Sequence, residues 1–396
     1  MLKLNSINYP DMEKAPTCPS CGSISAIRKG IRKNKLQAIQ KYKCKSCRRV
    51  FTQKGLKHKN YPAKIILNAI SNYNLGNNLE ASAKLINSRF KTNITSKNVQ
   101  LWVKEFASQL PFSKLRKEAI NLHNPKNIIH KQTLNHLQPY TFKYHKAKLY
   151  LIFHSRPYNN EFHNIAHFCE TLKNYLEKIS TKEFPHHIFT YNKNNIVSAT
   201  AIAKNNDGLV SMKNNYLSIS VRGNVSETDV AKNNNQRASQ IKFNHLEIKK
   251  LQKNNFACKM AELALNLAIS NKERHNAIRD FFLINDSTTI AAEVPVYLTN
   301  WDVNYYKNQK GFTLNLSSYT TPITGHIDIL QIRNGLLHIL DYKPEADKQN
   351  PIEQLTIYAL SLSRKLKLPL YYFKCAWFDE DNYYEFFPLH AVYEKK

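Results

Sequence analysis

The fold is decided by residues 323–358, which read ITGHIDILQIRNGLLHILDYKPEADKQNPIEQLTIY. Two apolar, strand-like runs flank Asn334-Gly335, and a charged loop and a helix-like segment follow them. Asn-Gly between such runs predicts a hairpin with a two-residue type I′ turn, because this turn needs positive φ at both central residues. A two-residue turn also fixes the register of the strands. The facing pairs are then Arg333 with Leu336, Leu330 with Ile339 and Asp328 with Asp341.

Two carboxylates face each other across this predicted hairpin. Facing side chains lie roughly 4.5–5.5 Å apart at Cβ, and like charges at that distance destabilise a sheet. A divalent cation between Asp328 and Asp341 removes the repulsion, and oxygen ligands suit Mg²⁺. Lys343 shares the face of Asp341, because the side-chain period of a strand is two. Two acids and an ammonium group on one face could bind a metal ion, orient a water molecule and stabilise charge on a phosphate.

A family resemblance follows from the order of these motifs. The set consists of Gly325-His326-Ile327-Asp328, Asp341-Tyr342-Lys343 and Gln354-x-x-x-Tyr358. It resembles the RecB-like branch of the PD-(D/E)XK nuclease superfamily, although Ile327 stands where the motif has proline. The resemblance implies a restriction-endonuclease-like αβββαβ core with a mixed central sheet over residues 255–392.

The resemblance also implies residue roles. The expected ligands of Mg²⁺ or Mn²⁺ are Asp328, Asp341, the backbone carbonyl of Tyr342 and Glu293 on the adjacent strand. The other expected catalytic residues are Lys343, Gln354, Tyr358 and the upstream His275, with Glu262 as an alternative helix acid. Each short motif has an ordinary interpretation as well: a surface ion pair for Asp341 and Lys343, and a half-buried helix face for Gln354 and Tyr358.

The charge of the chain points to a polyanionic partner. Lys and Arg number 58 against 29 Asp and Glu, which gives a formal net charge of +29 and a pI near 9.7. Nucleic acid is the first partner this predicts, and an anionic membrane surface the second. No apolar run reaches the ~18 residues of a membrane span, and the first residues lack the apolar core of a signal peptide. We therefore expect a soluble, cytoplasmic protein that acts at DNA.

Two CxxC pairs near the N-terminus predict a zinc ribbon over residues 15–55. They are Cys18-Pro-Ser-Cys21 and Cys44-Lys-Ser-Cys47. Four thiolates satisfy Zn²⁺ fully, so the site is expected to be structural. The pattern resembles the ribbon that opens many insertion-element transposases, which implies that Arg28 and Arg32 between the pairs contact nucleic acid. The alternative is a ribbon that binds protein or serves folding alone.

Residues 60–110 are expected to form three helices in a helix-turn-helix arrangement. Pro62 can occupy the first turn of the first helix, Asn78 can cap the second, and Thr95 or Ser96 can cap the third. A turn followed by a capped basic helix is the geometry that places a recognition helix in the major groove. The alternative is a three-helix connector with a solvated charged face. The expected DNA-contacting residues of the third helix are Lys97, Asn98, Gln100 and Lys104.

The rest of the chain is less informative. Residues 111–135 are interpreted as a basic linker, and residues 136–250 as a mixed α/β domain of unknown role. Within that domain, residues 149–154 are expected to be a strand and residues 165–179 a helix. Residues 301–316 are expected to be a loop or hairpin.

The chain is therefore interpreted as a multidomain α+β protein and a metal-dependent DNA endonuclease. The ribbon and helix-turn-helix would grip double-stranded DNA, and the C-terminal core would cut it, with a homodimer for double-strand cutting. The resemblance to transposases suggests a role in transposition or integration of a mobile element. Two alternatives stay open: a DNA-binding regulator built on an inactive nuclease-like scaffold, and an RNA-processing nuclease.

Overall fold

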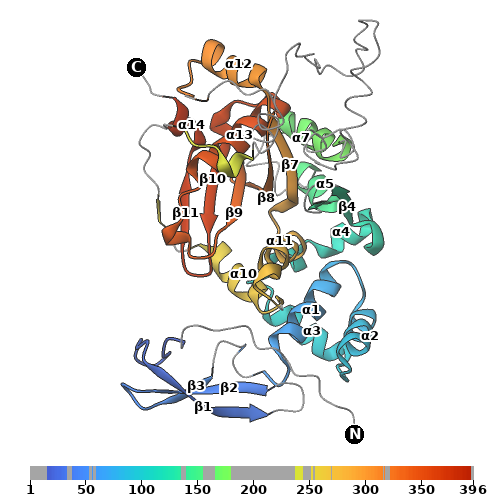
Figure 1. The fold of residues 1–396 in the computed structure, drawn as a ribbon. Helices are drawn as coiled ribbons and strands as arrows, with labels where there is room; N and C mark the ends of the chain where they lie inside the picture. Colours follow the sequence, from blue (N-terminus) through green and yellow to red (C-terminus); the bar gives the residue numbers. More distant parts are fainter. Residues whose placement is uncertain are drawn as a thin grey trace, which may run out of the picture.

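A computed structural model shows a mixed α/β protein whose N-terminal ribbon and helices lie below a large sheet in the view of Figure 1. The residues that the structure describes are 16–33, 38–52, 56, 59–134, 140–154, 166–179, 237–243, 251–252, 255–268, 270–314, 316 and 322–393.

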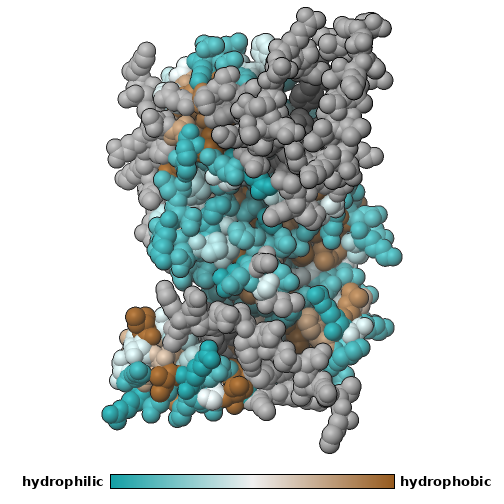
Figure 2. All heavy atoms as spheres, in the orientation of Figure 1, coloured by the Kyte–Doolittle hydropathy of each residue, from teal (hydrophilic) through white to brown (hydrophobic). Residues whose placement is uncertain are grey.

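The N-terminal ribbon is a three-stranded antiparallel sheet. Its strands β1 (Ala26–Lys33), β2 (Ala38–Cys44) and β3 (Val50–Thr52) lie in that order. Figure 2 shows hydrophobic residues on the ribbon, at the lower left of this face. The exposed hydrophobic residues of the ribbon are Ile24, Ile27, Ile31 and Val50.

Three helices follow the ribbon, as the sequence predicts. They are α1 (Ala63–Asn74), α2 (Leu79–Phe90) and α3 (Ser96–Glu105). Pro62 precedes α1 as its N-cap instead of occupying the first turn. Asn78 caps α2 by accepting from the backbone of Ala81, and Thr95 opens α3 in a capping box with Asn98. These local hydrogen bonds explain why the helix starts can be predicted from sequence.

The large sheet has eight strands among the described residues, in the order β4-β5-β7-β8-β9-β10-β11-β6. Only β9 and β10 run parallel, and α13 connects them; the other neighbours are antiparallel. The strands are β4 (Ile129–Leu134), β5 (Tyr140–His145), β6 (Leu251–Gln252), β7 (Thr289–Leu298), β8 (Ile323–Arg333), β9 (Leu336–Tyr342), β10 (Phe373–Phe378) and β11 (Tyr383–Phe386). The helices around them are α4 (Arg116–Leu122), α5 (Lys146–His154), α7 (Ala166–Lys178), α10 (Phe256–Leu265), α11 (Arg274–Asn285), α12 (Asn300–Lys310), α13 (Ile352–Leu366) and α14 (Pro388–Val392).

The predicted hairpin is present. Asn334 has φ of 49° and Gly335 has φ of 74°, so both turn residues have the positive φ that a type I′ turn requires. Arg333 pairs with Leu336, and the ladder extends to Ile329 and Leu340. One further step along that register puts Asp328 beside Asp341.

Three local expectations were wrong. Residues 111–135 are not a linker, since they form two 3₁₀ turns, α4 and β4. Residues 149–154 belong to helix α5 and not to a strand. Residues 300–310 form helix α12, which starts in a capping box between Thr299 and Asp302 and ends at left-handed Gly311. Short apolar runs do not separate helix from strand by period alone, and tertiary contacts decide here.

The described parts of residues 136–250 join the sheet of the C-terminal region. Strand β5 pairs with β7 through Lys143 and Tyr144, and α7 covers the expected helix at 165–179. Phe142, Leu172 and Ile241 share one hydrophobic core with β7 and α13. The expected boundary near residue 250 therefore does not separate two cores. The rest of the predicted middle domain, residues 155–165, 180–236 and 244–250, lies outside the described residues.

Two hydrophobic cores surround the sheet. On β9, Ile339 belongs to the first core, with α7, α12 and α13, whereas its neighbour Leu340 belongs to the second, with α10 and α11. The alternation follows from the two faces of a strand. Helices α1, α2 and α3 contribute to the second core, so the N-terminal helices pack directly on the C-terminal region.

Buried amides bond α1 to α11 across this second core. The Asn74 amide donates to Asn285 Oδ1 at 2.9 Å, and the Asn285 amide donates to Ser71 Oγ at 3.0 Å and to the Phe281 carbonyl at 3.1 Å. Asn74 and Asn285 are fully buried. Because buried polar groups need hydrogen-bond partners, the Asn74–Asn285 and Asn285–Ser71 contacts fix how the two helices meet. Among the described residues, no helix is long and apolar enough to cross a membrane.

We expect Asn285→Ala to lower the free energy of unfolding by about 1–3 kcal/mol, because it leaves the buried Asn74 amide without its acceptor. Urea unfolding measures the change. Asn304→Ala, on the exposed side of α12, is the matched control and should stay within about 0.5 kcal/mol of wild type. Equal stability of the two variants would contradict a role for this contact in joining the helices.

Candidate functional site

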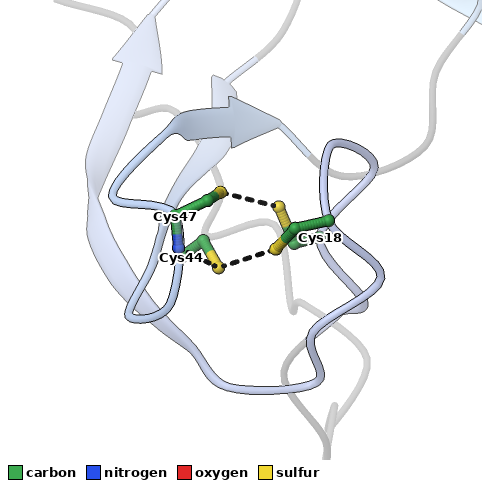
Figure 3. Close-up of side chains that lie close together, drawn as sticks. Cys18, Cys44 and Cys47 are labelled. Carbon is green, nitrogen blue, oxygen red and sulfur yellow. Dashed lines mark hydrogen bonds between the residues drawn. The ribbon is translucent and has the colours of Figure 1, made fainter.

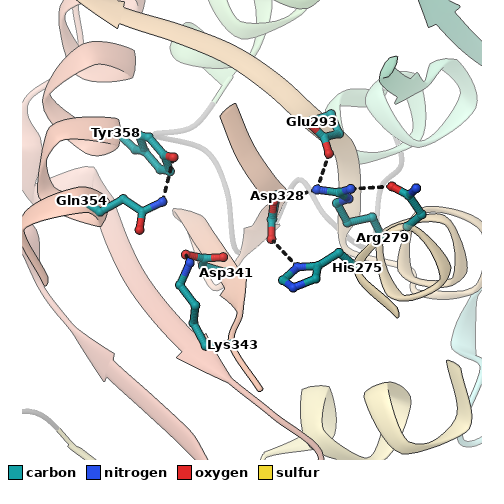
Figure 4. Close-up of polar contacts among 9 residues, drawn as sticks. His275, Arg279, Glu293, Asp328, Asp341, Lys343, Gln354 and Tyr358 are labelled. Atoms are coloured by element: carbon teal, nitrogen blue, oxygen red, sulfur yellow. Dashed lines mark hydrogen bonds and ion pairs between the residues drawn. The ribbon is translucent and has the colours of Figure 1, made fainter. Parts of the chain in front are cut away.

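A cavity of about 240 Å³ lies where β7, the β8–β9 hairpin, α11 and the first half of α13 meet. All of the side chains expected to be catalytic line it, and Figure 4 shows them turned toward one another. They are His275, Glu293, Asp328, Asp341, Lys343, Gln354 and Tyr358. The alternative helix acid Glu262 is exposed on α10 and does not line the cavity. The structure thus brings together residues that span 84 positions of sequence, from 275 to 358.

Three carboxylates form a row across three neighbouring strands. Glu293 on β7 lies beside Asp328 on β8, and Asp328 lies beside Asp341 on β9. The flanking pairs that set this register are Ala292 with Ile329, Val294 with Ile327, and Ile329 with Leu340. Only 6% of Glu293 and 4% of Asp341 is exposed. Like charges at facing positions destabilise a sheet, so the row needs nearby positive charge.

The backbone of Glu293 is strained. Its φ is +56° in the middle of β7, a left-handed value that is rare for a residue other than glycine. Such a conformation costs about 1–3 kcal/mol and persists where surrounding structure enforces it, often at functional sites. Pairing with β8 continues on both sides of the residue. The strain therefore sets this acid apart from an ordinary strand residue.

Lys343 pairs with the acid at the β9 end of the row. Its Nζ lies 2.7 Å from Asp341 Oδ2. Burial, and then the charge of Asp328, raises the pKa of Asp341 to about 7, although Lys343 opposes the shift. Burial acts to lower the pKa of Lys343, but Asp341 outweighs it and raises that pKa. The lysine is therefore cationic at neutral pH, and it lines the cavity.

Arg279 is the cation at the other end of the row, and the sequence analysis missed it. It forms an ion pair with Glu293 and donates to Asp328 Oδ1 at 2.9 Å. His275, one helical turn earlier on α11, has its Nδ1 3.7 Å from Asp328 Oδ2. Burial alone would raise the pKa of Asp328, but Arg279 and His275 hold it well below its usual range. The spacing of four residues from His275 was the signal that could have identified Arg279.

Helix α13 supplies the polar wall of the cavity. The Gln354 amide donates to the Tyr358 hydroxyl at 2.8 Å, as Figure 4 shows. Burial raises the pKa of Tyr358, and nearby Asp341 adds to the shift, so the phenol keeps its proton. A Cβ on Gly325 would lie 2.2 Å from the Tyr358 ring, so no larger residue fits there. This contact gives a physical reason for the glycine that precedes the first acid.

Tyr342 differs from the other expected residues. Its side chain is buried in the second core, where its ring lies 5.2 Å from that of His275. The hydroxyl lies 3.4 Å from Glu380 Oε2, away from the acids. Only its backbone carbonyl could therefore act as a ligand.

The acids do not converge as a closed metal cage would. Among the described residues, only the four N-terminal cysteines bring three or more potential ligand atoms within 4.8 Å of one another. Mg²⁺, however, usually keeps several waters and binds proteins through one or two carboxylates. Asp328 and Asp341 match that mode. On this side of the row, Lys343 pairs with Asp341. The donor set fits one hard divalent cation on this side of the row.

The four cysteines of the ribbon form a compact cluster that could hold a zinc ion. Cys18 Sγ lies 3.6 Å from Cys47 Sγ, and Cys21 Sγ lies 3.6 Å from Cys44 Sγ (Figure 3). A tetrahedral site with zinc–sulfur bonds of about 2.3 Å places its sulfurs about 3.8 Å apart. The observed spacing therefore fits zinc.

The two halves of the cysteine cluster have matching backbones. Gly22 and Arg48, the residues after the second cysteine of each pair, have φ of +71° and +61°. The Cys47 amide points at Cys44 Sγ at 3.5 Å, and this contact lowers the pKa of Cys44 to about 6. The Ser23 amide acts to lower the pKa of Cys21, but the thiols of Cys47 and Cys44 and burial raise it to about 12. Four ionised thiolates at this distance need a cation.

The residues expected to contact DNA are mostly at the surface. Lys97, Gln100 and Lys104 are exposed on α3, and Arg28 and Arg32 are exposed on β1. Asn98 is half-buried, and its carbonyl oxygen accepts from the backbone of Thr95 at 2.9 Å. Its side chain therefore supports the start of α3. Exposed Ile27 and Ile31 on β1 leave the ribbon compatible with a protein partner as well.

We expect one zinc ion per chain, lost in Cys44→Ser, because a zinc ion bound by four thiolates holds the two halves of the cluster together. Metal analysis of the purified chain, with and without a chelator, measures it. Cys258→Ser is the matched control, since that buried cysteine lies in α10 outside the cluster. Full zinc content in Cys44→Ser would contradict the assignment.

Comparison with known proteins adds no assignment to this geometry. No protein-family model, no curated protein and no solved structure matches the chain.

Proposed function

We propose that this protein is a metal-dependent nuclease that hydrolyses phosphodiester bonds in DNA. The observation that supports it most is the buried row of Glu293, Asp328 and Asp341 with Lys343 beside it in one cavity. Phosphodiester hydrolysis requires a nucleophilic water, a cation that binds the phosphate and groups that stabilise the added negative charge. The site offers side chains for each of these tasks.

The acids at the hairpin would hold the metal. Asp328 and Asp341 line the cavity, and the Tyr342 carbonyl would be a further donor. When bound there, Mg²⁺ would lower the pKa of a water molecule and polarise the phosphate. Lys343 would release its ion pair with Asp341 and bind the phosphate oxygen or the attacking water. The water loses a proton to solvent as it attacks phosphorus, the bond to the leaving oxygen breaks, and that oxygen takes a proton from solvent.

The remaining residues would orient these groups. Arg279 and His275 fix the carboxylate of Asp328 from the α11 side. Gln354 and Tyr358 form a neutral hydrogen-bonded pair on the α13 side. Because Tyr358 keeps its proton, its hydroxyl can donate to a phosphate oxygen. The site is therefore walled on both sides by groups that bind without adding negative charge.

Binding of double-stranded DNA is proposed for the N-terminal helices. The support is the exposed basic side of α3 and the formal charge of +29. The ribbon, with a structural zinc ion, would add Arg28 and Arg32. A role in transposition or integration, and a homodimer that cuts both strands, extend the same proposal.

We expect Asp341→Asn and Lys343→Met each to reduce the cutting of supercoiled plasmid in Mg²⁺ by on the order of 100-fold or more, because each removes a group that meets the reacting phosphate. The rate of plasmid nicking measures it. Asp347→Asn and Lys348→Met, exposed in the following loop, are the matched controls and should cut as wild type does. Wild type that leaves plasmid intact under varied metal and sequence supports the regulator instead. Faster cutting of RNA than of duplex DNA supports the RNA-processing alternative.

Binding to duplex DNA should weaken steeply with salt, because phosphate contacts release counterions. Lys97→Ala with Lys104→Ala should reduce the slope of log affinity against log salt by about 2. Fluorescence anisotropy of a labelled duplex measures the slope with catalysis blocked by Asp341→Asn. Lys178→Ala with Lys310→Ala is the matched control, because these exposed lysines lie on α7 and α12, far from α3 in Figure 1. Equal slopes in the two double variants would exclude α3 as the DNA contact.

A further inference from the structure

We propose that Arg279 takes the place of a second metal ion, so that the site binds one divalent cation, between Asp328 and Asp341. Glu293 would then hold Arg279 and not the metal. This inference rests on the proposed function only where it takes the metal ion to serve DNA cutting. The number of bound ions can be measured without DNA. It concerns Arg279, which no sequence motif assigned.

The charges of the row support a single ion. Arg237 lines the cavity as well as Arg279 and Lys343. Among the side chains that form ion pairs in the row, three carboxylates face two cations, which leaves one negative charge if all are ionised. One divalent cation changes that balance to one positive charge, which suits an anionic phosphate. A second would bring three positive charges into a largely buried site. Unless anions accompany it, the desolvation and repulsion of such a set are unfavourable.

The position of the guanidinium supports the same conclusion. Arg279 occupies the side of the row between Glu293 and Asp328, and only 13% of its side chain is exposed. It takes Oδ1 of Asp328, so an ion shared with Asp341 would bind through Oδ2, which lies 3.7 Å from His275 Nδ1. Asn276 accepts from the other arm of the guanidinium and so fixes its plane. A metal ion at Glu293 would have to displace the Arg279 guanidinium from both Glu293 and Asp328.

The helix that carries Arg279 is itself fixed. Ile278, Phe281 and Phe282 on α11 are buried in the second core, and Asn285 is bonded to α1. The guanidinium therefore cannot leave the row through a movement of α11 without disrupting that core. Moving the side chain alone would leave Glu293 as an unpaired buried charge. One feature would favour a second ion: Glu293 Oε2 is buried without a hydrogen-bond partner among the described residues.

The test counts Mn²⁺ ions on the zinc-loaded full chain by electron paramagnetic resonance, with calorimetry for affinity and no DNA. Wild type should bind one Mn²⁺ in the acid row, and Asp341→Asn should lose it. Arg279→Gln should bind a second Mn²⁺, because it frees two carboxylates. Arg279→Lys keeps the charge and should bind one. The double variant Arg279→Gln with Glu293→Gln should also return to one.

Other outcomes would overturn the proposal. Two Mn²⁺ ions in wild type would mean that a second ion displaces the Arg279 guanidinium. One ion in folded Arg279→Gln would mean that the guanidinium does not keep a second ion out. Circular dichroism checks folding of each variant. If Arg279→Gln does not fold, Glu293→Gln decides: one ion with near wild-type affinity supports the proposal, and loss of the ion makes Glu293 a ligand.

The nuclease proposal and this one fail separately. A chain that leaves plasmid intact yet shows the predicted Mn²⁺ counts loses the nuclease assignment and keeps the role of Arg279. A chain that cuts plasmid but binds two Mn²⁺ ions loses the role of Arg279 and keeps the nuclease.

Discussion

Three acids buried side by side on neighbouring strands are the constraint on which the rest of the site depends. Glu293, Asp328 and Asp341 repel one another across the sheet, and two of them are almost fully buried. Burial raises the pKa of Glu293 and of Asp341 to about 7, and the chain also brings in positive charge from both ends of the row. Arg279 comes from α11, and Lys343 is the residue that follows β9, the strand that carries Asp341.

Helix α11 has two tasks that use adjacent parts of its surface. His275 and Arg279 line the cavity, whereas Ile278, Phe282 and Asn285 are buried in the second core or bonded to α1. Because a packed helix moves as a unit, a change in how α1 meets α11 would reach Asp328 within one side-chain contact. One shared helix thus links the packing of the N-terminal helices to the acid row.

The parts of the site that the sequence predicted are those with local causes. The Asn334-Gly335 turn fixes the pairing of the hairpin, and strand period alone places Lys343 on the face of Asp341. Helix starts at Asn78 and Thr95 follow from their own side chains. Arg279 and the left-handed backbone of Glu293 depend on strands and helices far apart in sequence. The same holds for α5, whose buried Lys148 donates to the carbonyls of Leu283 and Thr289.

The two clusters of the protein differ for the same reason. The cysteines converge because each pair is shaped by its own few residues, with Gly22 and Arg48 in matching conformations. The acid row instead depends on distant parts of the chain. Tyr140 of β5 lines its cavity, and α1 packs against α11, the helix that carries Arg279. Residues 255–392 therefore contain the acids but not all of the structure that holds them. A fragment cut at the boundary suggested by the motifs would lose support on both sides of the row, through β5 and through α1.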